Sequence, residues 1–250
     1  IMCTSIIYIN YSNEWPVIIG SNRDEDLNRE SKFPGRHWAN NYPNIIAGKD
    51  EEKQGSWLGI NDFNIVSIIH NRKKNKNIIN SISRGKIVLE VLKYSNINKS
   101  LEYIYKLNRF DYENFNLLIA NSKSVYWVKH DLSEKDIQIE KLNEGISILT
   151  EKDLNDKSDE KINYLLNLFS HSKVPRPSNN LWESWANNLT KKNKNFDENK
   201  NICFLNYKLN YGTRSSSLIA IPNSEANNKN IVFKSTNSFP LKNNYLDVKI

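Results

Sequence analysis

Apolar and polar positions at the start of the chain alternate in the manner of a β-hairpin. Residues 4–10 are rich in Ile and Tyr, residues 12–14 are a polar Ser-Asn-Glu turn, and residues 17–19 form a second apolar run. Two apolar runs joined by a short polar turn predict two antiparallel strands. Because a hairpin returns the chain to where it began, we expect the residues after the second run to lie beside the residue that precedes the first.

Similar apolar runs predict further strands, most of them toward the two ends of the chain. Residues 26–42 differ, because Pro and Gly interrupt a polar stretch without periodicity, and they predict an irregular loop. The further strands are expected at residues 45–48, 56–60, 65–69, 115–120, 125–128, 137–139, 146–149, 215–221 and 231–234.

Apolar positions recur at helical spacing in four segments toward the middle of the chain. In residues 83–93, Ser83 is a suitable N-cap, and four aliphatic side chains between residues 87 and 92 share one face. The other three helices are expected at residues 98–107, 159–169 and 181–189. Strands in hairpins, with helices grouped between them, predict an α+β fold.

The length of the chain, 250 residues, suits one large domain or two small ones. Its hydrophobic content of 38% and aromatic content of 11% are sufficient for a packed core. The charged, Asn-rich residues 191–201 are not followed by a second hydrophobic core, and no internal repeat occurs. A single domain over residues 1–250 is therefore expected.

The charge balance is mildly basic, with a formal net charge of +7. Such a surface is compatible with acidic ligands such as carboxylates, phosphates or haem propionates. No basic helix and no patch of interleaved basic and aromatic residues occurs in the sequence, so nucleic acid is not an expected partner.

The cysteine content and the apolar runs bear on location. Two cysteines, Cys3 and Cys203, make no disulfide framework and favour a reducing compartment. Polar residues interrupt the first apolar run, which disfavours a signal peptide, and no run approaches the ~18 apolar residues of a membrane-spanning helix. We expect a cytoplasmic protein without a transmembrane segment, or a mitochondrial one if the source is eukaryotic. No His or Cys spacing predicts a metal site, and no cofactor is expected.

Cys3, Arg23 and Asp24 place a thiol, a guanidinium and a carboxylate at one end of the predicted hairpin. A free thiol titrates near ~8.5, and a neighbouring Arg favours the thiolate. We expect translation to begin at Met2 and Met2 to be removed. The α-amine of Cys3, which titrates near ~7.7–8.0, could then act as general base for its own side chain. The alternatives are a Cys that serves as a small buried hydrophobic residue and a charged motif that is a solvated turn.

Six short motifs occur in one order along the chain. They are Met-Cys-Thr at 2–4, Asn-Arg-Asp-Glu at 22–25, Gly-Ser-Trp-Leu-Gly-Ile-Asn at 55–61, Ser-Arg-Gly at 83–85, Phe-Asn-Leu at 115–117 and Tyr-Gly-Thr-Arg at 211–214. This ordered set resembles the NRDE family, also called the transport and Golgi organisation 2 family. That family in turn resembles the N-terminal-nucleophile hydrolases, particularly the penicillin V acylase and bile salt hydrolase branch. The resemblance implies a four-layer αββα sandwich of two antiparallel sheets covered by helices.

The resemblance also implies site residues. In the acylase branch an Asn at the position of Asn71 donates to the oxyanion, and such a donor stabilises the tetrahedral intermediate by ~3–4 kcal/mol. Asn71 could instead cap the turn before a basic run. Arg214 matches a position near the nucleophile, and two arginines, Arg23 and Arg214, around one thiol would form an anion-binding pocket. A purely structural pairing of an Arg with Asp24 remains open.

The chain departs from its relatives at residues 149–151. The acylase branch has Leu-Thr-Asn there, with the Asn as a second oxyanion donor, and this chain has Leu-Thr-Glu. An ionised Glu151 cannot donate a hydrogen bond, which disfavours efficient amide hydrolysis unless Asn155 or a backbone N–H substitutes. Trp57 suits core packing as well as a ligand contact. The candidate substrate-binding residues are Asn22, Glu25, Trp57 and Glu151.

Two function classes therefore remain. The first is a hydrolase that cleaves non-peptide amide (C–N) or related acyl bonds, with Cys3 as the nucleophile. The second is a non-catalytic binding or trafficking protein for an acidic amphipathic ligand such as haem or acyl-CoA lipid, as proposed for eukaryotic relatives linked to Golgi organisation. Glu151 favours binding, whereas the intact Cys3-Thr4 start favours chemistry. A small acidic or acyl ligand is the expected partner in both classes.

Overall fold

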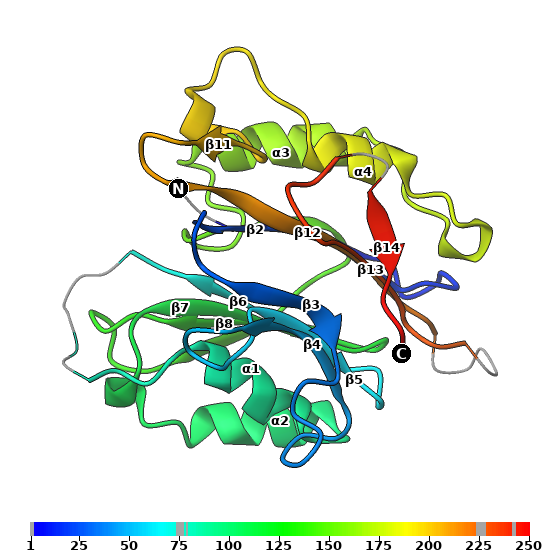
Figure 1. The fold of residues 1–250 in the computed structure, drawn as a ribbon. Coiled ribbons are helices and arrows are strands. Elements are labelled where there is room, and N and C mark those ends of the chain that lie inside the picture. The colour runs from blue at the N-terminus through cyan, green and yellow to red at the C-terminus, as the bar shows by residue number, and fades with distance from the viewer. Residues whose placement is uncertain (1–2, 74–77, 79, 224–228, 242–243) are drawn as a thin grey trace. The chain divides into compact units, whose positions relative to one another are not determined.

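The computed structural model describes residues 3–73, 78, 80–223, 229–241 and 244–250. By the density of its internal contacts the chain divides into two units. The first unit comprises residues 1–28 and 143–248, and the second comprises residues 29–142 and 249–250. Within the described residues, each unit contains one seven-stranded antiparallel sheet (Figure 1). The expected removal of Met2 concerns a position outside the described residues.

The sheet of the first unit has the strand order β10-β1-β2-β12-β13-β14, with β11 paired to β12. The predicted hairpin forms β1 and β2, and β12 pairs along nearly the whole length of β2. The elements are β1 (Thr4–Ile9), β2 (Val17–Asp26), β10 (Gly145–Leu149), α3 (Glu160–Ser170), η2 (Pro177–Asn179), α4 (Glu183–Leu189), η3 (Glu198–Lys200), β11 (Leu205–Asn206), β12 (Tyr211–Ile221), β13 (Val232–Thr236) and β14 (Tyr245–Asp247).

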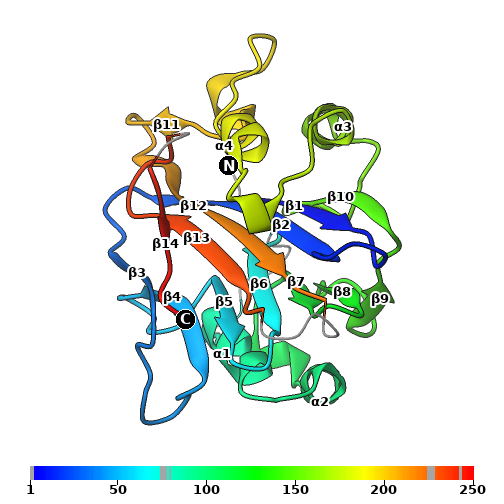
Figure 2. The same ribbon diagram turned by 90° about the vertical axis from the view of Figure 1, so that its right-hand side faces the viewer.

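Helices α3 and α4 cover one face of this sheet (Figures 1 and 2). Alternate residues of each strand point to this face, and Ile6, Ile18 and Leu218 meet the helical side chains Phe169 and Trp185 there. The Phe169 and Trp185 rings pack edge to face with centroids 5.2 Å apart. This helix-covered face holds the core of the first unit.

The sheet of the second unit runs in chain order from β3 to β9 as a meander, and α1 packs on β4, β5 and β6. Helices α1 and α2 contact each other on the same side, where their buried side chains join one cluster with those of the sheet. The elements are β3 (Ser31–Gly35), β4 (Ile45–Asp50), β5 (Leu58–Asn61), β6 (Val66–Asn71), α1 (Gly85–Leu92), α2 (Ile97–Tyr105), η1 (Arg109–Asp111), β7 (Phe115–Ala120), β8 (Val125–His130) and β9 (Gln138–Lys141).

Two local predictions are wrong. The segment expected to be an irregular loop, residues 26–42, contains β3, which tolerates Pro34 because it is an edge strand with a shifted register. The expected N-cap Ser83 is also displaced, since α1 is capped at Arg84 without a side-chain hydrogen bond. An edge strand such as β3 and a helix start without a side-chain cap, as in α1, leave little pattern of apolar and polar residues in the sequence.

Gly55 lies against Gly85 at the start of α1. The Ser56 N–H donates to the Gly85 carbonyl oxygen at 3.1 Å, and a Cβ at Gly55 would lie 2.6 Å from the Gly85 carbonyl carbon. Backbone atoms cannot move away as a flexible side chain can. We expect Gly55→Ala to lower the free energy of unfolding by about 1–3 kcal/mol in urea melts. Gly35→Ala is the matched control, since its Cβ would meet only ordinary contacts at 3.4 Å, and an equal loss in both variants would contradict the packing argument.

Candidate functional site

The first hairpin brings Cys3 beside Asp24. Cys3 precedes β1, and the register pairs Thr4 with Asn22 across β1 and β2. The Asp24 backbone N–H donates to Cys3 Sγ at 3.4 Å, and the thiol lies 3.6 Å from the Asp24 carbonyl oxygen. Turn geometry near residues 10–16 thus fixes the position of the thiol at the opposite end of the hairpin.

The surroundings of Cys3 disfavour its thiolate. Burial raises the pKa of Cys3 to about 12, and the nearby Asp24 charge adds to the rise. The Asp24 N–H and the Arg23 guanidinium act in the opposite direction, but their effect is smaller. The Arg23 charge therefore acts in the expected direction, but burial and the Asp24 charge outweigh it. Activation requires a further group beside the sulfur.

Asp24 is a buried carboxyl with one hydrogen-bonded oxygen and one oxygen without a partner among the described residues. Its side chain is only 2% exposed, and Thr213 Oγ1 donates to Oδ1 at 2.7 Å. The other oxygen, Oδ2, is buried and has no hydrogen-bond partner among the described residues. Burial raises the pKa of Asp24 to about 7, with Lys161 and the Thr213 hydrogen bond partly opposing the shift. A carboxyl that titrates near neutral pH is suited to proton transfer.

Two residues of β12 hold Asp24 in place. The Tyr211 hydroxyl donates to the Asp24 carbonyl oxygen at 2.8 Å, and Thr213 Oγ1 also accepts from the Phe204 N–H at 3.2 Å. Thr213 and Tyr211 were not predicted individually as site residues, although the motif at 211–214 contains both. The alternation of side chains in β12 identifies them only once its pairing with β2 is known.

Arg23 lies on the other face of β2. Consecutive residues of a strand point to opposite faces, so Arg23 shares a face with Glu25 and not with Asp24. Arg23 is 4% exposed, and its Nη2 lies 3.8 Å from Glu25 Oε2. The structural pairing of an Arg with Asp24 remains an open alternative, and the nearby Glu25 carboxylate partly neutralises the Arg23 guanidinium.

Asn22 joins the sheet to the helices. It is fully buried, and its Nδ2 donates to the carbonyl oxygens of Leu189 and Ile202, both at 2.8 Å. Both N–H bonds of the amide are therefore used within the protein. The prediction that Asn22 contacts a substrate has no support from this geometry.

The contacts of Arg214 and of the loop after β10 are as follows, and the roles expected of Arg214 and Glu151 remain predictions. The register between β2 and β12 shifts at Arg214, and its Nη1 donates to the Leu27 carbonyl oxygen. Glu151 is half-buried just after β10. Asn155, the suggested substitute oxyanion donor, gives its Nδ2 to Ser147 Oγ at 3.2 Å and accepts from the Ile148 N–H at 2.7 Å. Its amide is therefore committed to the end of β10.

Asn71 and Trp57 belong to the second unit. Asn71 is the last residue of β6, where it pairs with Phe115 and is exposed. Trp57 is half-buried, and its ring covers Gly48, where an added Cβ would lie 2.4 Å from it. The first unit thus brings together Cys3, Asp24 and their supports, while the roles expected of Asn71 and Trp57 remain predictions.

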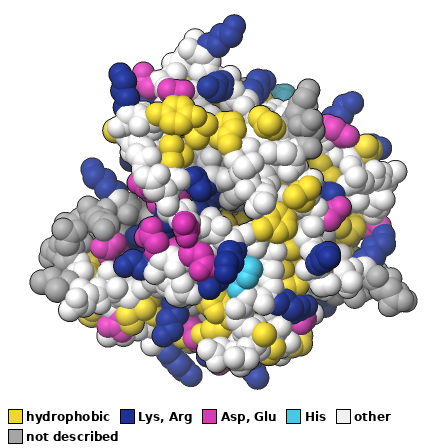
Figure 3. Space-filling model, in the orientation of Figure 1, with side chains coloured by type: hydrophobic (Ala, Val, Ile, Leu, Met, Phe, Trp, Pro, Cys, Tyr) yellow, Lys and Arg dark blue, Asp and Glu magenta, His cyan; other side chains and the backbone are white. Residues whose placement is uncertain are grey.

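The described residues were also surveyed for other kinds of site. They contain no group of three or more His, Cys, Asp or Glu side chains arranged to hold a metal ion. None of the described helices is both long enough and apolar enough to cross a membrane. On the face drawn in Figure 3, Lys and Arg side chains are scattered among acidic ones.

The family model described as Transport and Golgi organisation 2 matches residues 2–233. The chain belongs to this family. No curated protein sequence matches it. The match covers every motif on which the sequence resemblance rests, so the predicted membership in the Transport and Golgi organisation 2 family is confirmed.

Solved structures similar to this family member include two hydrolases. The Caenorhabditis elegans ortholog of N-acylethanolamine-hydrolyzing acid amidase has a TM-score of 0.57 at 12% identity, covering 99% of this chain and 100% of that one. A variant of the conjugated bile acid hydrolase from Clostridium perfringens has a TM-score of 0.54 at 12% identity, covering 98% of this chain and 92% of that one. This likeness confirms the predicted α+β fold, similar to N-terminal-nucleophile hydrolases, with two antiparallel sheets covered by helices.

Proposed function

We propose that this protein is a cysteine hydrolase that cleaves non-peptide amide (C–N) or related acyl bonds, with Cys3 as its nucleophile. The contact of Cys3 Sγ with the backbone of Asp24, a buried carboxyl with one open oxygen, is the observation that carries the proposal. The names of the similar structures, an acid amidase ortholog and a conjugated bile acid hydrolase, support the choice of bond class.

In the proposed reaction, Cys3 Sγ attacks the acyl carbon of the substrate. Its proton passes to the α-amine of Cys3, which becomes available once the residues before it are removed. The resulting ammonium returns that proton to the departing amine as the C–N bond breaks. Water then attacks the thioester and loses a proton to the same amine, which releases a carboxylic acid and regenerates the thiol.

Asp24 contributes a carboxylate close to this proton transfer. Thr213 holds Oδ1, so Oδ2 is the oxygen that can accept a hydrogen bond from an ammonium or a substrate N–H. A cation there stabilises the ionised carboxylate and lowers its pKa from the raised value. The same cation also favours the thiolate of Cys3. It is therefore the further group that activation of the sulfur requires.

The charges near Cys3 support a neutral acyl substrate. Arg23 lies within ion-pair distance of Glu25, and Asp24 and Glu25 both raise the pKa of the thiol through their negative charge. A polyanion such as haem or acyl-CoA would meet these two carboxylates beside the thiol, and the guanidinium of Arg23 is already shared with Glu25. The binding-module alternative therefore receives no support from the described contacts.

The test compares two forms of the protein, one beginning at Cys3 and one that retains Met2. Iodoacetamide alkylation of Cys3 is followed by mass spectrometry from pH 6 to 10, with the buried Cys203 as the internal control. The form that begins at Cys3 is expected to react at least about 10-fold faster at pH 7, because a thiol pKa lowered by one unit gives tenfold more thiolate. Equal pH profiles in the two forms would exclude self-activation by the α-amine.

A further inference from the structure

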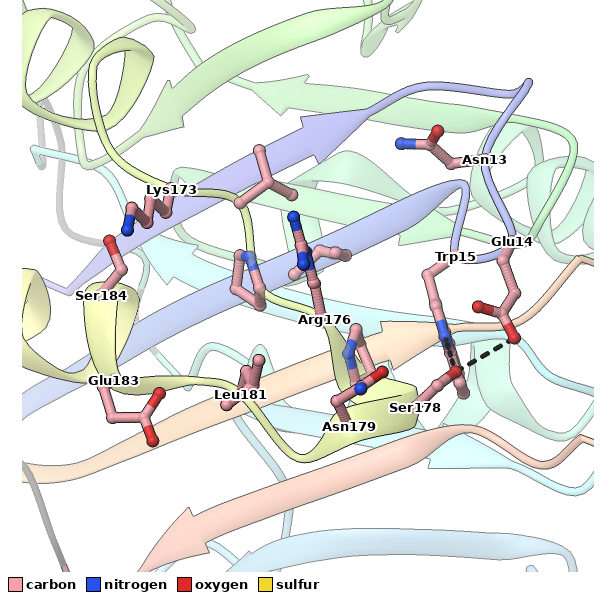
Figure 4. Close-up of a pocket in the computed structure, with 14 residues that line it drawn as sticks. Asn13, Glu14, Trp15, Lys173, Arg176, Ser178, Asn179, Leu181, Glu183 and Ser184 are labelled. Atoms are coloured by element: carbon pink, nitrogen blue, oxygen red, sulfur yellow. Dashed lines mark hydrogen bonds between the residues drawn. The ribbon is translucent and has the colours of Figure 1, made fainter.

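The first unit contains a second candidate site at the turn end of the hairpin. A pocket of about 880 Å³ is lined by the β1–β2 turn, by the segment that follows α3, and by the start of α4 (Figure 4). Its size falls within the range of small-molecule sites. Cys3 precedes β1 and Trp15 precedes β2, so the two lie at opposite ends of a hairpin whose paired stretch is ~20 Å long.

Arg176 lies at the centre of this pocket on a stiff loop. Its side chain extends among the lining residues in Figure 4, and no described residue forms a hydrogen bond or ion pair with its guanidinium. Pro175 and Pro177 flank it, and backbone hydrogen bonds of 2.9 and 3.1 Å join it to Leu181 in both directions. The prolines and this bridge restrict the backbone at Arg176, whereas its side chain is exposed and can turn toward a ligand.

The charges around the pocket leave one positive charge unbalanced. The lining contains two acidic residues, Glu14 and Glu183, and two basic ones, Lys173 and Arg176. Glu14 is already paired with Lys229, which lies outside the lining. The remaining charges are two cations and one anion, and Figure 4 places Lys173 and Glu183 away from the guanidinium. A single planar guanidinium suits one carboxylate, which it binds through two parallel hydrogen bonds.

The walls around Arg176 combine polar and apolar side chains and include an indole whose polar atom is occupied. Trp15 Nε1–H donates to Ser178 Oγ at 2.9 Å, and Ser178 Oγ donates to Glu14 Oε1 at 3.0 Å (Figure 4). Trp15 is therefore fixed and, being only 8% exposed, offers the pocket a small part of its ring. The other apolar lining residues are Ile18, Val174, Pro175, Pro177 and Leu181.

We propose that this pocket binds a small organic monoanion, a carboxylate carrying an apolar or aromatic body. The carboxylate pairs with Arg176, and the body packs against Trp15 and its aliphatic neighbours. The site is separate from Cys3, so it does not depend on the proposed hydrolase activity.

The test uses 3-phenylpropanoate as the probe and 3-phenylpropanamide as its neutral counterpart. Calorimetric titration of the full-length protein is expected to give saturable binding of the carboxylate and at least about 10-fold weaker binding of the amide, because a hydrogen bond to a charged group is lost. Arg176→Gln is expected to weaken the carboxylate at least about 10-fold, while Arg176→Lys keeps the charge and loses less. Lys99→Gln removes the same charge outside the pocket and should leave binding unchanged.

Amide proton shifts locate the bound probe. Shifts confined to residues 13–18 and 173–184 would agree with the proposal. Equal affinity for the acid and the amide, an unaffected Arg176→Gln variant, or no binding up to 10 mM probe, roughly the weakest affinity of a small ligand, would overturn it. Tighter binding of phenyl phosphate than of the carboxylate would overturn the assignment to a monoanion.

Discussion

Replacement of Cys3 by Ser is expected to lower the turnover of an N-acyl amide substrate by several orders of magnitude. Serine keeps the shape of the side chain, but its hydroxyl is a far weaker nucleophile than a thiolate at neutral pH. Substrate affinity should change little, because serine has nearly the same size as cysteine, and the effect should appear in kcat and not in KM. The measurement is steady-state hydrolysis of a panel of N-acyl amides by protein that begins at residue 3.

Cys203→Ser is the matched control for this substitution. Cys203 is buried at 2% exposure in the helix-covered core, so its replacement should affect stability but not turnover per folded molecule. Glu151→Asn is the complementary variant, and it should raise turnover by restoring an amide donor where an oxyanion develops. A wild type that turns over no amide, or a fully active Cys3→Ser variant, would exclude the nucleophilic role of Cys3.

Asp24→Asn is expected to make the protein that retains Met2 more stable above pH 7, and to abolish the activity of the protein that begins at Cys3. Asp24 has a folded-state pKa raised to about 7 from an ordinary value of 3.8, and burial is the main cause. The folded state therefore holds this proton more tightly than the unfolded state. The stabilisation of the folded state by this bound proton is complete below about pH 4, declines between pH 4 and 7, and is absent above pH 7.

Above pH 7 the wild-type fold must bury an ionised carboxylate, which costs free energy. The neutral amide introduced by Asp24→Asn removes this cost. Three pKa units correspond to an upper limit on the order of 4 kcal/mol for the gain in stability above pH 7. Urea melts of wild type and variant at pH 4.5, 6 and 8 test this, with the exposed Asp136→Asn as the control whose curve should parallel wild type. A variant that is less stable than wild type at pH 8 would show that the charged carboxylate is compensated within the fold.

The parts of the site that depend on local sequence could be predicted. Apolar runs and a polar turn determined the hairpin, and the hairpin alone brings Cys3 to Asp24. The face of the sheet to which each side chain points was harder to predict. The strand continues from Val17 through Asp26, so the motif at 22–25 alternates between two faces, whereas a turn after the second strand would have allowed Arg23 and Asp24 to point the same way.

The contacts that tune Asp24 could not be predicted because their partners are distant in sequence. Thr213 reaches Asp24 across the pairing of β12 with β2, which joins residues nearly 190 positions apart. Periodicity indicates that β12 is a strand but not which strand it will pair with. The pocket around Arg176 likewise needs Trp15 and Ser178 together, and a Pro-containing linker gives no signal of that.

The discontinuous course of the first unit has a consequence for the order of folding. The second unit is almost one continuous segment, and its meander pairs each strand with the next, so it can form as soon as residue 142 has been synthesised. The first unit must wait for β12, the central neighbour of β2, which is made about 70 residues later. Until then the hairpin that carries Cys3 lacks Thr213 and Tyr211. The reactive end of the protein is therefore completed late, after most of the chain has been synthesised.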